Sequence, residues 1–233
     1  MIRLSMVVKN EETRYLTRVL ESAKKYISDA VIIDDGSTDN TVALCKDLLK
    51  TVPHTIIENR LSNFHKNEWE LRFQQWNETI KNNPDWIIFL DADEIFEDSF
   101  ATGVNDLINV TDCDLYAFRL YDFWDEQHYR EDSIWRAHAI YRPFLLRYKK
   151  DFPFEFKKTT LHSFRMPVNV FELPHRCSKY RLKHYGWARE EDRIAKYNLY
   201  LKLDPNGTYG SLAQYMSILD PTPNLVKWEE NEA

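Results

Sequence analysis

Asp91 and Asp93 carry the clearest chemical signal in the sequence. They follow directly after Trp86–Leu90, an apolar run typical of a buried strand. Two carboxylates two positions apart, just past such a strand, cannot both be neutralised by local pairing, and a hard divalent cation would relieve their repulsion. Mg²⁺ or Mn²⁺ bound there would also accept diphosphate oxygens. We therefore predict a metal site; the alternative is a solvated turn that begins a helix near Glu97.

A second acidic segment begins at Asp34 and Asp35, directly after another short apolar run. Gly36 permits a tight turn, and Ser37 can cap the helix that follows. Asp34 stands at the tip of the predicted strand, where its carboxylate can accept N–H donors from a nucleobase. Uracil and guanine both offer such donors, so the nucleotide stays open. The alternative is that these acids serve only the turn and the cap.

Strands and helices alternate over the first ninety residues and would position these acids. Short apolar runs predict strands at 4–8, 30–33, 55–57 and 86–90. Apolar residues at helical spacing predict helices over 16–27, 42–49 and 69–80. Apolar strands joined by amphipathic helices indicate a parallel sheet that is covered on both faces. Ligands of such sheets bind beyond the carboxyl ends of the strands, so the acids should gather along one edge.

The alternation fades after residue 100. Segment 114–148 contains strand-like runs and many aromatic residues, and segment 151–176, with several prolines, is predicted to form loops and short strands. Helices are predicted over 188–203 and within 207–219. The polar tail 221–233 is predicted to be peripheral or frayed.

The composition excludes several classes of function. Of the 233 residues, 43% are hydrophobic and 14% aromatic, enough to bury a core, so extended disorder is excluded. Acidic residues outnumber basic ones by 37 to 31, for a net charge of −6, so no nucleic-acid partner is expected. None of the 5 glycines lies in a glycine-rich phosphate-binding motif.

The sequence shows no sign of export or of a transmembrane segment. Its start lacks a basic segment followed by a long apolar one, and its longest apolar run is far too short for a bilayer. Three distant cysteines form no disulfide pattern and fit a reducing compartment. We therefore expect a soluble, cytoplasmic protein, and a peripheral membrane contact of the C-terminal helices stays open.

Three segments resemble family 2 glycosyltransferases of the GT-A fold. They are Val7–Glu12 (VVKNEE), Val31–Thr41 (VIIDDGSTDNT) and Trp86–Glu94 (WIIFLDADE), which have the order and spacing of that family. The resemblance implies an α/β fold with a mostly parallel, Rossmann-like sheet, helices on both faces and a mixed C-terminal extension on the acceptor side. It is specific over about residues 1–98 and weaker beyond.

The resemblance also implies an activity and a division of the chain. The activity is an inverting, metal-dependent transfer of a sugar from a nucleotide sugar of the UDP, GDP or dTDP type to a glycan, lipid-linked or protein acceptor. Residues 1–98 would form the nucleotide-sugar-binding half of one domain and residues 99–220 its acceptor-binding half. Residues 221–233 would be a tail.

The same resemblance assigns roles to residues of the motifs. Base and ribose would lie near Val8, Asn10, Glu11 and Asp34, Asp91 would contact the ribose or the metal, and Asp93 would bind the metal. Arg60 or Lys66, together with the metal, can stabilise the departing diphosphate. The predicted nucleotide-sugar site thus comprises Val8, Asn10, Glu11, Asp34, Asp35, Arg60, Lys66, Asp91 and Ala92.

His184 is a further candidate for a metal ligand. Lys183–Trp187 (KHYGW) is similar to the K-H-Y-G-Y segment of many relatives, in which the histidine can bind the metal. A neutral imidazole would favour Mn²⁺ somewhat over Mg²⁺. The alternative is a histidine packed in the core.

The catalytic base of the predicted reaction stays open. An inverting transfer needs a base near the acceptor hydroxyl. The segment Tyr141–Arg147, followed by Leu161-His162-Ser163, resembles the acceptor-side stretch R-x-F…H-E of the family, but Ser163 stands where many relatives carry an acid. Asp151, Glu155 and His162 are the candidates, and each can equally be an ordinary surface residue.

Two other functions compete with the transferase. Phosphotransferases of the haloacid dehalogenase type also carry D-x-D after an apolar strand, with the first aspartate, here Asp91, as nucleophile. Their motif normally continues with Thr or Val two places later, where this chain has Ile95. A non-catalytic relative that binds nucleotide sugars or glycans is the third hypothesis, motivated by Ser163.

Overall fold

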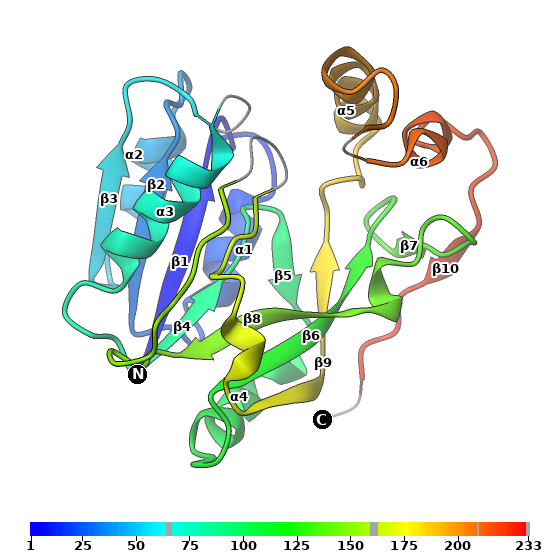
Figure 1. The fold of residues 1–233 in the computed structure, drawn as a ribbon. Coiled ribbons are helices and arrows are strands. Elements are labelled where there is room, and N and C mark those ends of the chain that lie inside the picture. Colours follow the sequence, from blue (N-terminus) through cyan, green and yellow to red (C-terminus); the bar gives the residue numbers. More distant parts are fainter. Residues whose placement is uncertain (64–66, 159–162, 209, 232–233) are drawn as a thin grey trace.

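The computed structural model describes residues 1–63, 67–158, 163–208 and 210–231 (Figure 1). The strands are β1 (Ile2–Val8), β2 (Asp29–Asp34), β3 (His54–Glu58), β4 (Trp86–Phe89), β5 (Glu94–Phe96), β6 (Leu115–Asp122), β7 (His128–Arg130), β8 (Tyr141–Arg147), β9 (His175–His184) and β10 (Leu225–Lys227). The helices are α1 (Leu16–Ala23), α2 (Thr41–Leu48), α3 (Glu68–Thr79), α4 (Ser99–Ile108), α5 (Glu190–Leu203) and α6 (Leu212–Ser217), with 3-10 turns η1 (Ala137–Ala139) and η2 (Val170–Glu172).

The N-terminal half is a parallel sheet that is covered on both faces. β1 pairs in parallel with β2 and β4, and β3 continues the sheet beside β2. Leu4 and Met6 of β1 pack in one core cluster with Leu16 of α1, whereas Val7 packs with Leu71 of α3 on the opposite face. Because alternate side chains of a strand point to opposite faces, both faces need apolar residues, and the strands are therefore apolar throughout.

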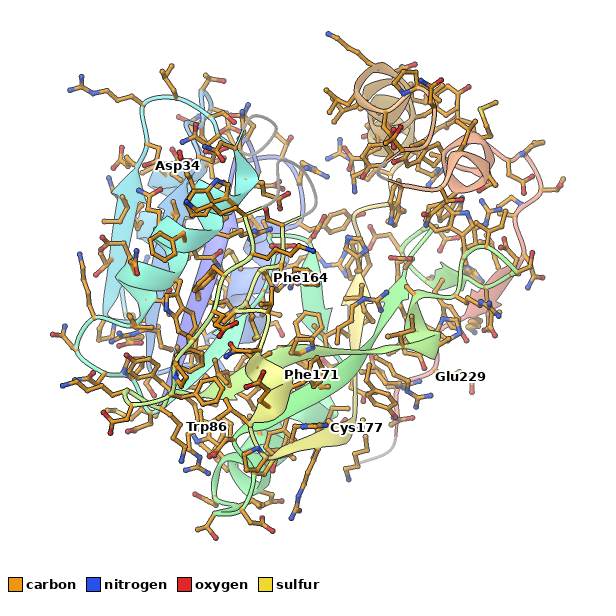
Figure 2. All side chains as sticks on the ribbon, in the orientation of Figure 1. Asp34, Trp86, Phe164, Phe171, Cys177 and Glu229 are labelled. Carbon is orange, nitrogen blue, oxygen red and sulfur yellow. The ribbon has the colours of Figure 1, made fainter. Side chains whose placement is uncertain are left out.

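The carboxyl ends of these strands lie at one edge of the sheet. Asp34 lies at the end of β2 at that edge, and Trp86, the first residue of β4, lies at the opposite edge (Figure 2). The predicted strands and helices of this half are confirmed. Their bounds differ at the ends; the first helix, for example, ends at Ala23 rather than at residue 27.

The C-terminal half extends the same sheet in a mixed arrangement. The full strand order is β3-β2-β1-β4-β8-β6-β9-β5. β8 runs antiparallel to β4 and β6, β9 runs parallel to β6, and β5 runs antiparallel to β9. The predicted boundary at residue 98 thus falls between β5 and α4, inside one continuous sheet. α5 and α6 lie beyond the end of the sheet at which β9 ends (Figure 1).

The C-terminal tail is more ordered than the sequence predicts. β10 pairs antiparallel with β7, and the Trp228 ring lies 5.1 Å from that of Tyr121 and 5.4 Å from that of Phe123 (centroid distances). The prediction of a peripheral or frayed tail is therefore wrong for residues 225–228. A single aromatic residue in a polar segment anchors it, because the ring buries a large apolar area.

Across the described parts of the chain, no helix has the length and apolar character needed to cross a membrane.

Candidate active site

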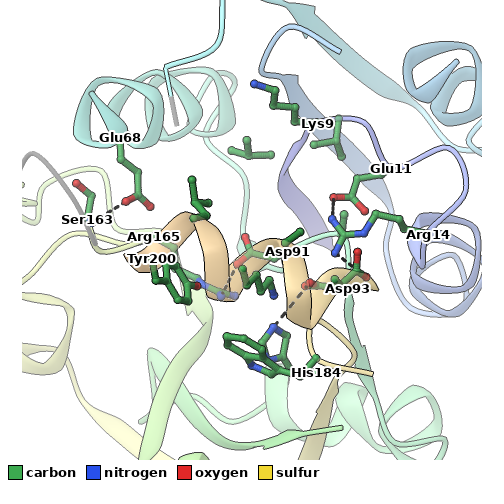
Figure 3. A pocket seen from close by; sticks show the side chains of 18 of the residues that line it. Lys9, Glu11, Arg14, Glu68, Asp91, Asp93, Ser163, Arg165, His184 and Tyr200 are labelled. Carbon is green, nitrogen blue, oxygen red and sulfur yellow. Dashed lines mark hydrogen bonds and ion pairs between the residues drawn. The ribbon is translucent and has the colours of Figure 1, made fainter. Parts of the chain in front are cut away.

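A cavity of about 660 Å³ lies at the carboxyl edge of the sheet, between β1, β4 and α5 (Figure 3). Its wall combines segments that are far apart in the sequence: the loop after β1, α3, the turn after β4, the segment that begins at Ser163, the end of β9, and α5. The charged and aromatic side chains of the wall are Lys9, Glu11, Arg14, Glu68, Arg72, Asp91, Asp93, Arg165, His184, Trp187, Asp192, Lys196, Tyr200, Asp204 and Tyr215.

Asp93 and His184 meet in this wall. Oδ2 of Asp93 lies 3.7 Å from Nε2 of His184. On its other side, Nδ1 of His184 lies 2.7 Å from Oδ1 of Asp122, its neighbour in the β6–β9 register. A carboxylate only accepts, so Nδ1 carries the proton and donates it, and Nε2 faces Asp93. Burial lowers the pKa of His184, but Asp93 and Asp122 outweigh burial and raise it overall.

Gly186 leaves the space in which these groups converge. A Cβ at this position would lie 2.5 Å from Nε2 of His184, 2.7 Å from Oδ2 of Asp93 and 2.7 Å from Nζ of Lys196. Any side chain there would fill the space between a carboxylate, an imidazole and an ammonium group. Lys196 comes from α5 and donates to the carbonyl oxygen of Gly186 at 2.6 Å. Burial lowers the pKa of Lys196, which the attraction of Asp93 offsets only in part.

The donor set at Asp93 and His184 fits a divalent cation. One carboxylate oxygen and one imidazole nitrogen face each other beside the space at Gly186, and Asp122 holds the imidazole in the tautomer that a metal requires. No group of three or more His, Cys, Asp or Glu side chains with metal-binding geometry occurs among the residues that the structure describes. These two residues would hold Mn²⁺ or Mg²⁺, and such an ion would supply positive charge to ligand oxygens.

Asp91 is neutralised within the protein by arginines from other segments of the chain. Its Oδ2 accepts from Arg165 at 2.8 Å, and its Oδ1 lies 3.5 Å from Nη1 of Arg72. Burial raises the pKa of Asp91, but Arg165 and Arg72 outweigh burial, and the pKa is lowered overall. The sequence excludes only local pairing for the two acids, and it gives no sign of this distant partner. Arg165 lies 74 residues away in the sequence and is no local partner.

Arg165 also holds Glu94, which follows the acidic pair. Its Nη1 lies 2.5 Å from Oε2 of Glu94, and its Nη2 lies 2.8 Å from Oε1. Oε2 of Glu94 in turn accepts from the backbone N–H of Asp91 at 2.8 Å. One arginine therefore joins Asp91 and Glu94, the residues on either side of Ala92 and Asp93 in the turn between β4 and β5.

Glu11 and Arg14 connect the loop after β1 to α5. Nη1 of Arg14 lies 3.0 Å from Oε1 of Glu11, and its Nη2 lies 3.2 Å from Oδ2 of Asp192. Nothing in the described chain hydrogen-bonds to Oε2 of Glu11, which is buried. Burial raises the pKa of Glu11 to about 7; Asp93 adds to this shift and Arg14 opposes it.

The predicted nucleotide-binding residues fall into two groups. Val8, Glu11, Asp91 and Ala92 line the cavity. Asn10, Asp34, Asp35 and Arg60 do not appear among its lining residues. Lys66, like the base candidate His162, lies outside the described residues.

Residues of the second group form hydrogen bonds within the loops at the same carboxyl edge of the sheet. Asn10, with a positive φ of 53°, accepts from the backbone N–H of Thr38 at 2.8 Å. Asp34 accepts from the backbone N–H of Ser37 at 3.1 Å. Asp35 is fully buried and accepts from Oγ of Ser62 at 2.6 Å and from the backbone N–H of Asn63 at 2.8 Å. These contacts shape the rim of the edge, and the nucleotide roles of these residues stay predictions.

Asp151 and Glu155, the described candidates for the base, are exposed and do not line the cavity. The physical reason is the packing of their segment. The rings of Phe154 and Phe156 lie 4.7 and 5.7 Å from that of Trp76 on α3, which turns the acidic side chains of the segment outward. The structure therefore does not bring these two acids to the site.

Several residues of the wall carry no motif in the sequence. Arg72 lies four residues after Glu68 on α3, 3.6 Å from it, in a helix that the apolar spacing alone identifies. Lys196 lies in a predicted helix whose many charges are typical of a solvated face. For Arg165 the sequence offers no signal, because its carboxylate partners come from a distant segment.

Residues 4–170 match the family model described as glycosyl transferase family 2, and the chain belongs to this family. The match confirms the predicted family, and glycosyltransferase is the enzyme class of that family. It leaves the phosphotransferase alternative without support.

The chain is 25% identical over 215 residues to the uncharacterized proteins Rv3786c of Mycobacterium tuberculosis and Mb3815c of Mycobacterium bovis. Each alignment covers 87% of this chain and 51% of the relative, so the chain spans about half the length of these curated relatives.

Among solved structures, the fold is similar to that of Staphylococcus aureus TarS residues 1–349. The TM-score is 0.59 at 15% identity, and the alignment covers 94% of this chain and 69% of that one. The same TarS segment in complex with UDP-GlcNAc gives a TM-score of 0.57 at 14% identity, over 94% and 70% of the two chains. At such identities the likeness concerns the fold, and it confirms the predicted GT-A class.

Proposed function

We propose that this chain transfers a sugar from a nucleotide sugar to an acceptor, in a metal-dependent reaction in the cavity between β1, β4 and α5. One observation carries the proposal: Asp93 and His184 converge there, with Asp122 behind the imidazole, in a chain of glycosyl transferase family 2. The TarS structures with UDP and UDP-GlcNAc make uridine nucleotides the first ligands to test.

In this proposal the two acids of the motif have different roles. Asp93 and His184 hold the cation, which supplies positive charge to the diphosphate. Asp122 holds the imidazole in place. Asp91 is fixed by Arg165 and Arg72 and accepts hydrogen bonds from the ribose. An Asp91 whose two oxygens already face arginines is a poor metal ligand, because the metal would have to displace a guanidinium group.

The base that accepts the proton of the acceptor hydroxyl comes from the cavity wall in this proposal. Glu11, Glu68 and Asp192 are carboxylates of the wall outside the metal site. Asp151 and Glu155 lie on the surface, as described above. A pKa near 7, as at Glu11, suits a general base at neutral pH.

Thermal unfolding with UDP, GDP and dTDP, each with and without Mn²⁺ or Mg²⁺, tests the proposal. A ligand at a hundred times its Kd stabilises the folded state by about 2.7 kcal/mol. For a chain of this size that raises Tm by roughly 5–10 °C. Asp93→Asn should lose the part of this shift that requires the metal, and Asp112→Asn, at an exposed acid, is the matched control. No shift with any of the three nucleotides would overturn the proposal.

Turnover separates the transferase from a non-catalytic relative. Wild-type protein with metal and a UDP-sugar, GDP-sugar or dTDP-sugar should release the nucleoside diphosphate, either to water or to an added glycan, lipid-linked or protein acceptor. Mass spectrometry of the product identifies which of these acceptors takes the sugar. Tight binding of the nucleotide sugar without release of the diphosphate would instead support a binding module.

A further inference from the structure

Lys196 is a cationic group of the cavity that the proposed metal site does not use. Its Nζ donates to the carbonyl oxygen of Gly186 at 2.6 Å and lies 4.3 Å from the ring centroid of Trp187. The same Nζ would lie 2.7 Å from a Cβ on Gly186, beside Asp93 and His184. The ammonium group therefore borders the space at which the predicted metal ligands converge.

The partners of Lys196 set it apart from the arginines of the cavity. Arg14 faces two carboxylates, and so do Arg72 and Arg165. No described carboxylate lies within ion-pair distance of Lys196; Asp93 and Asp122 attract it only from farther away. The other lysine of the wall, Lys9, extends away from Asp93 and His184 (Figure 3).

An ammonium group in this position calls for an anionic ligand. It has three N–H donors, and one of them is used by the Gly186 carbonyl. A partly buried cation without a counter-charge is costly, and a ligand that supplies anionic oxygens removes that cost. A metal ion held by Asp93 and His184 would also attract anionic ligands. The ammonium group of Lys196 and the metal ion would therefore face the same anion.

α5 brings Lys196 to this place through contacts with the loop after β1. Asp192 lies one helical turn before Lys196 and pairs with Arg14 at 3.2 Å. Nη1 of Arg189 donates to the carbonyl oxygen of Thr13 at 3.0 Å. These two contacts attach the start of α5 to the half of the molecule that carries Asp91 and Asp93. Lys196 lies on the next turn of the helix and therefore faces the cavity.

We propose that Lys196 binds the diphosphate of the nucleotide sugar and stabilises the negative charge on the departing nucleoside diphosphate. This inference rests on the proposed function. In the transfer, the bond between the anomeric carbon and the phosphate oxygen breaks, and the electron pair leaves with the diphosphate. A bond forms between the anomeric carbon and the acceptor oxygen, whose proton goes to the base. Lys196 keeps its protons and donates two hydrogen bonds to diphosphate oxygens.

Calorimetric titration of Lys196→Met tests the inference. The ligand is whichever of UDP, GDP and dTDP stabilises wild-type protein, and the matching nucleoside is titrated in parallel under the same metal concentration. Lys196→Met should weaken diphosphate binding about tenfold or more, since charge-assisted hydrogen bonds are lost, and leave nucleoside binding unchanged. Lys196→Arg should recover part of the affinity. Lys202→Met, at an exposed lysine of the same helix, should bind like wild type.

The outcomes distinguish this inference from the proposed function. If wild-type protein binds none of the three diphosphates, the proposed function fails first. If wild type binds one of them and Lys196→Met binds it equally tightly, the inference alone is overturned. Lys196→Gln, which can keep a hydrogen bond to the Gly186 carbonyl, serves as a second variant if Lys196→Met unfolds. An equal loss of nucleoside and diphosphate affinity in both neutral variants would also overturn the inference, because it would indicate a structural role.

Discussion

At the scale of single residues, the site depends on a close approach that one side chain would prevent. Gly186 is required for space: the three groups around it leave no room for a Cβ. His184 comes from the end of β9, Asp93 from the turn between β4 and β5, and Lys196 from α5, so none of them is held by its sequence neighbours alone. Because Gly186 has no side chain, groups from three elements that are distant in the sequence can approach one another there.

Gly186→Ala should therefore disable the site without unfolding the protein. The new methyl group would push against Nε2 of His184 and Oδ2 of Asp93, each at less than 3 Å. We expect loss of metal-dependent nucleotide stabilisation and a Tm in the absence of ligand within a few degrees of wild type. Thermal unfolding with and without nucleotide and Mn²⁺ measures both. A variant that keeps the full ligand shift would show that the space at Gly186 is not part of the site.

Glu11 gives the protein a pH-dependent stability with a defined sign. Burial, together with Asp93 and Asp192, raises its pKa from 4.5 to about 7, and Arg14 and Lys196 oppose the shift. Between these two values the folded state binds more protons at Glu11 than the unfolded state does, so its contribution to stability falls as pH rises through this window, by roughly 3 kcal/mol.

Glu11→Gln should remove this dependence. The variant should unfold at a higher denaturant concentration than wild type above pH 7, and should have no such advantage below pH 4.5. Urea unfolding of both proteins at pH 4, 6 and 8 measures the difference. A difference between the two proteins that does not change with pH would contradict the raised pKa.

At the scale of elements, Arg165 joins the segment after β8 to the turn between β4 and β5. Its partner Glu94 is 2% exposed, and Asp91 lies beside it. Removing one member of a buried ion pair leaves an uncompensated charge, whereas removing both members costs much less. The turn that carries the acidic pair is therefore held by an element that the turn's own sequence does not specify.

Arg165→Met should lower the free energy of unfolding by about 3 kcal/mol. The double variant Arg165→Met/Glu94→Gln should recover much of this loss, because Glu94 no longer carries a buried charge and Asp91 keeps Arg72 as a partner. Arg176→Met, at a pair with Asp112 in which both side chains are about half exposed or more, is the control and should change stability by about 1 kcal/mol or less. Urea unfolding measures all three. A loss that the second substitution does not relieve would contradict the buried-charge explanation.

The elements also show which features the sequence reveals. The strands β1, β2 and β4 were predictable because burial on both faces makes them continuously apolar. β9 was missed, although Ser178, Tyr180 and Leu182 are buried at alternate positions, because basic residues dominate the segment between them. Asp91, Asp93 and His184 lie in motifs and could be named. Arg165 pairs with carboxylates from a distant segment, and Lys196 donates to a backbone carbonyl oxygen. No local sequence pattern predicts contacts of either kind.

At the scale of the whole molecule, the last residues of the described chain brace the main sheet. The Trp228 ring packs against Tyr121 of β6 and lies 4.0 Å from the guanidinium carbon of Arg181. Glu230 accepts from Lys183 at 2.5 Å, next to His184. The C-terminal segment thus supports the strand that delivers the histidine to the site.

Trp228→Ala should lower the free energy of unfolding by about 2–3 kcal/mol, below the value for a fully buried tryptophan because this ring is partly exposed. Trp228→Phe keeps an aromatic ring and should retain most of the stability. Thermal unfolding of the two variants measures the effect. Equal loss in both variants, or none in either, would contradict a packing role for the ring.

The family match ends at residue 170, before His184, Gly186 and Lys196. The matched part of the chain therefore supplies the cavity wall from Val7 to Arg165, and the part beyond it supplies the wall from His184 to Tyr215. Two members of this family can agree throughout the matched region and still differ at His184 and Lys196, the two groups beyond it that we propose act on the diphosphate. Differences in this short stretch should therefore change how tightly close relatives hold the diphosphate, whichever nucleotide carries it.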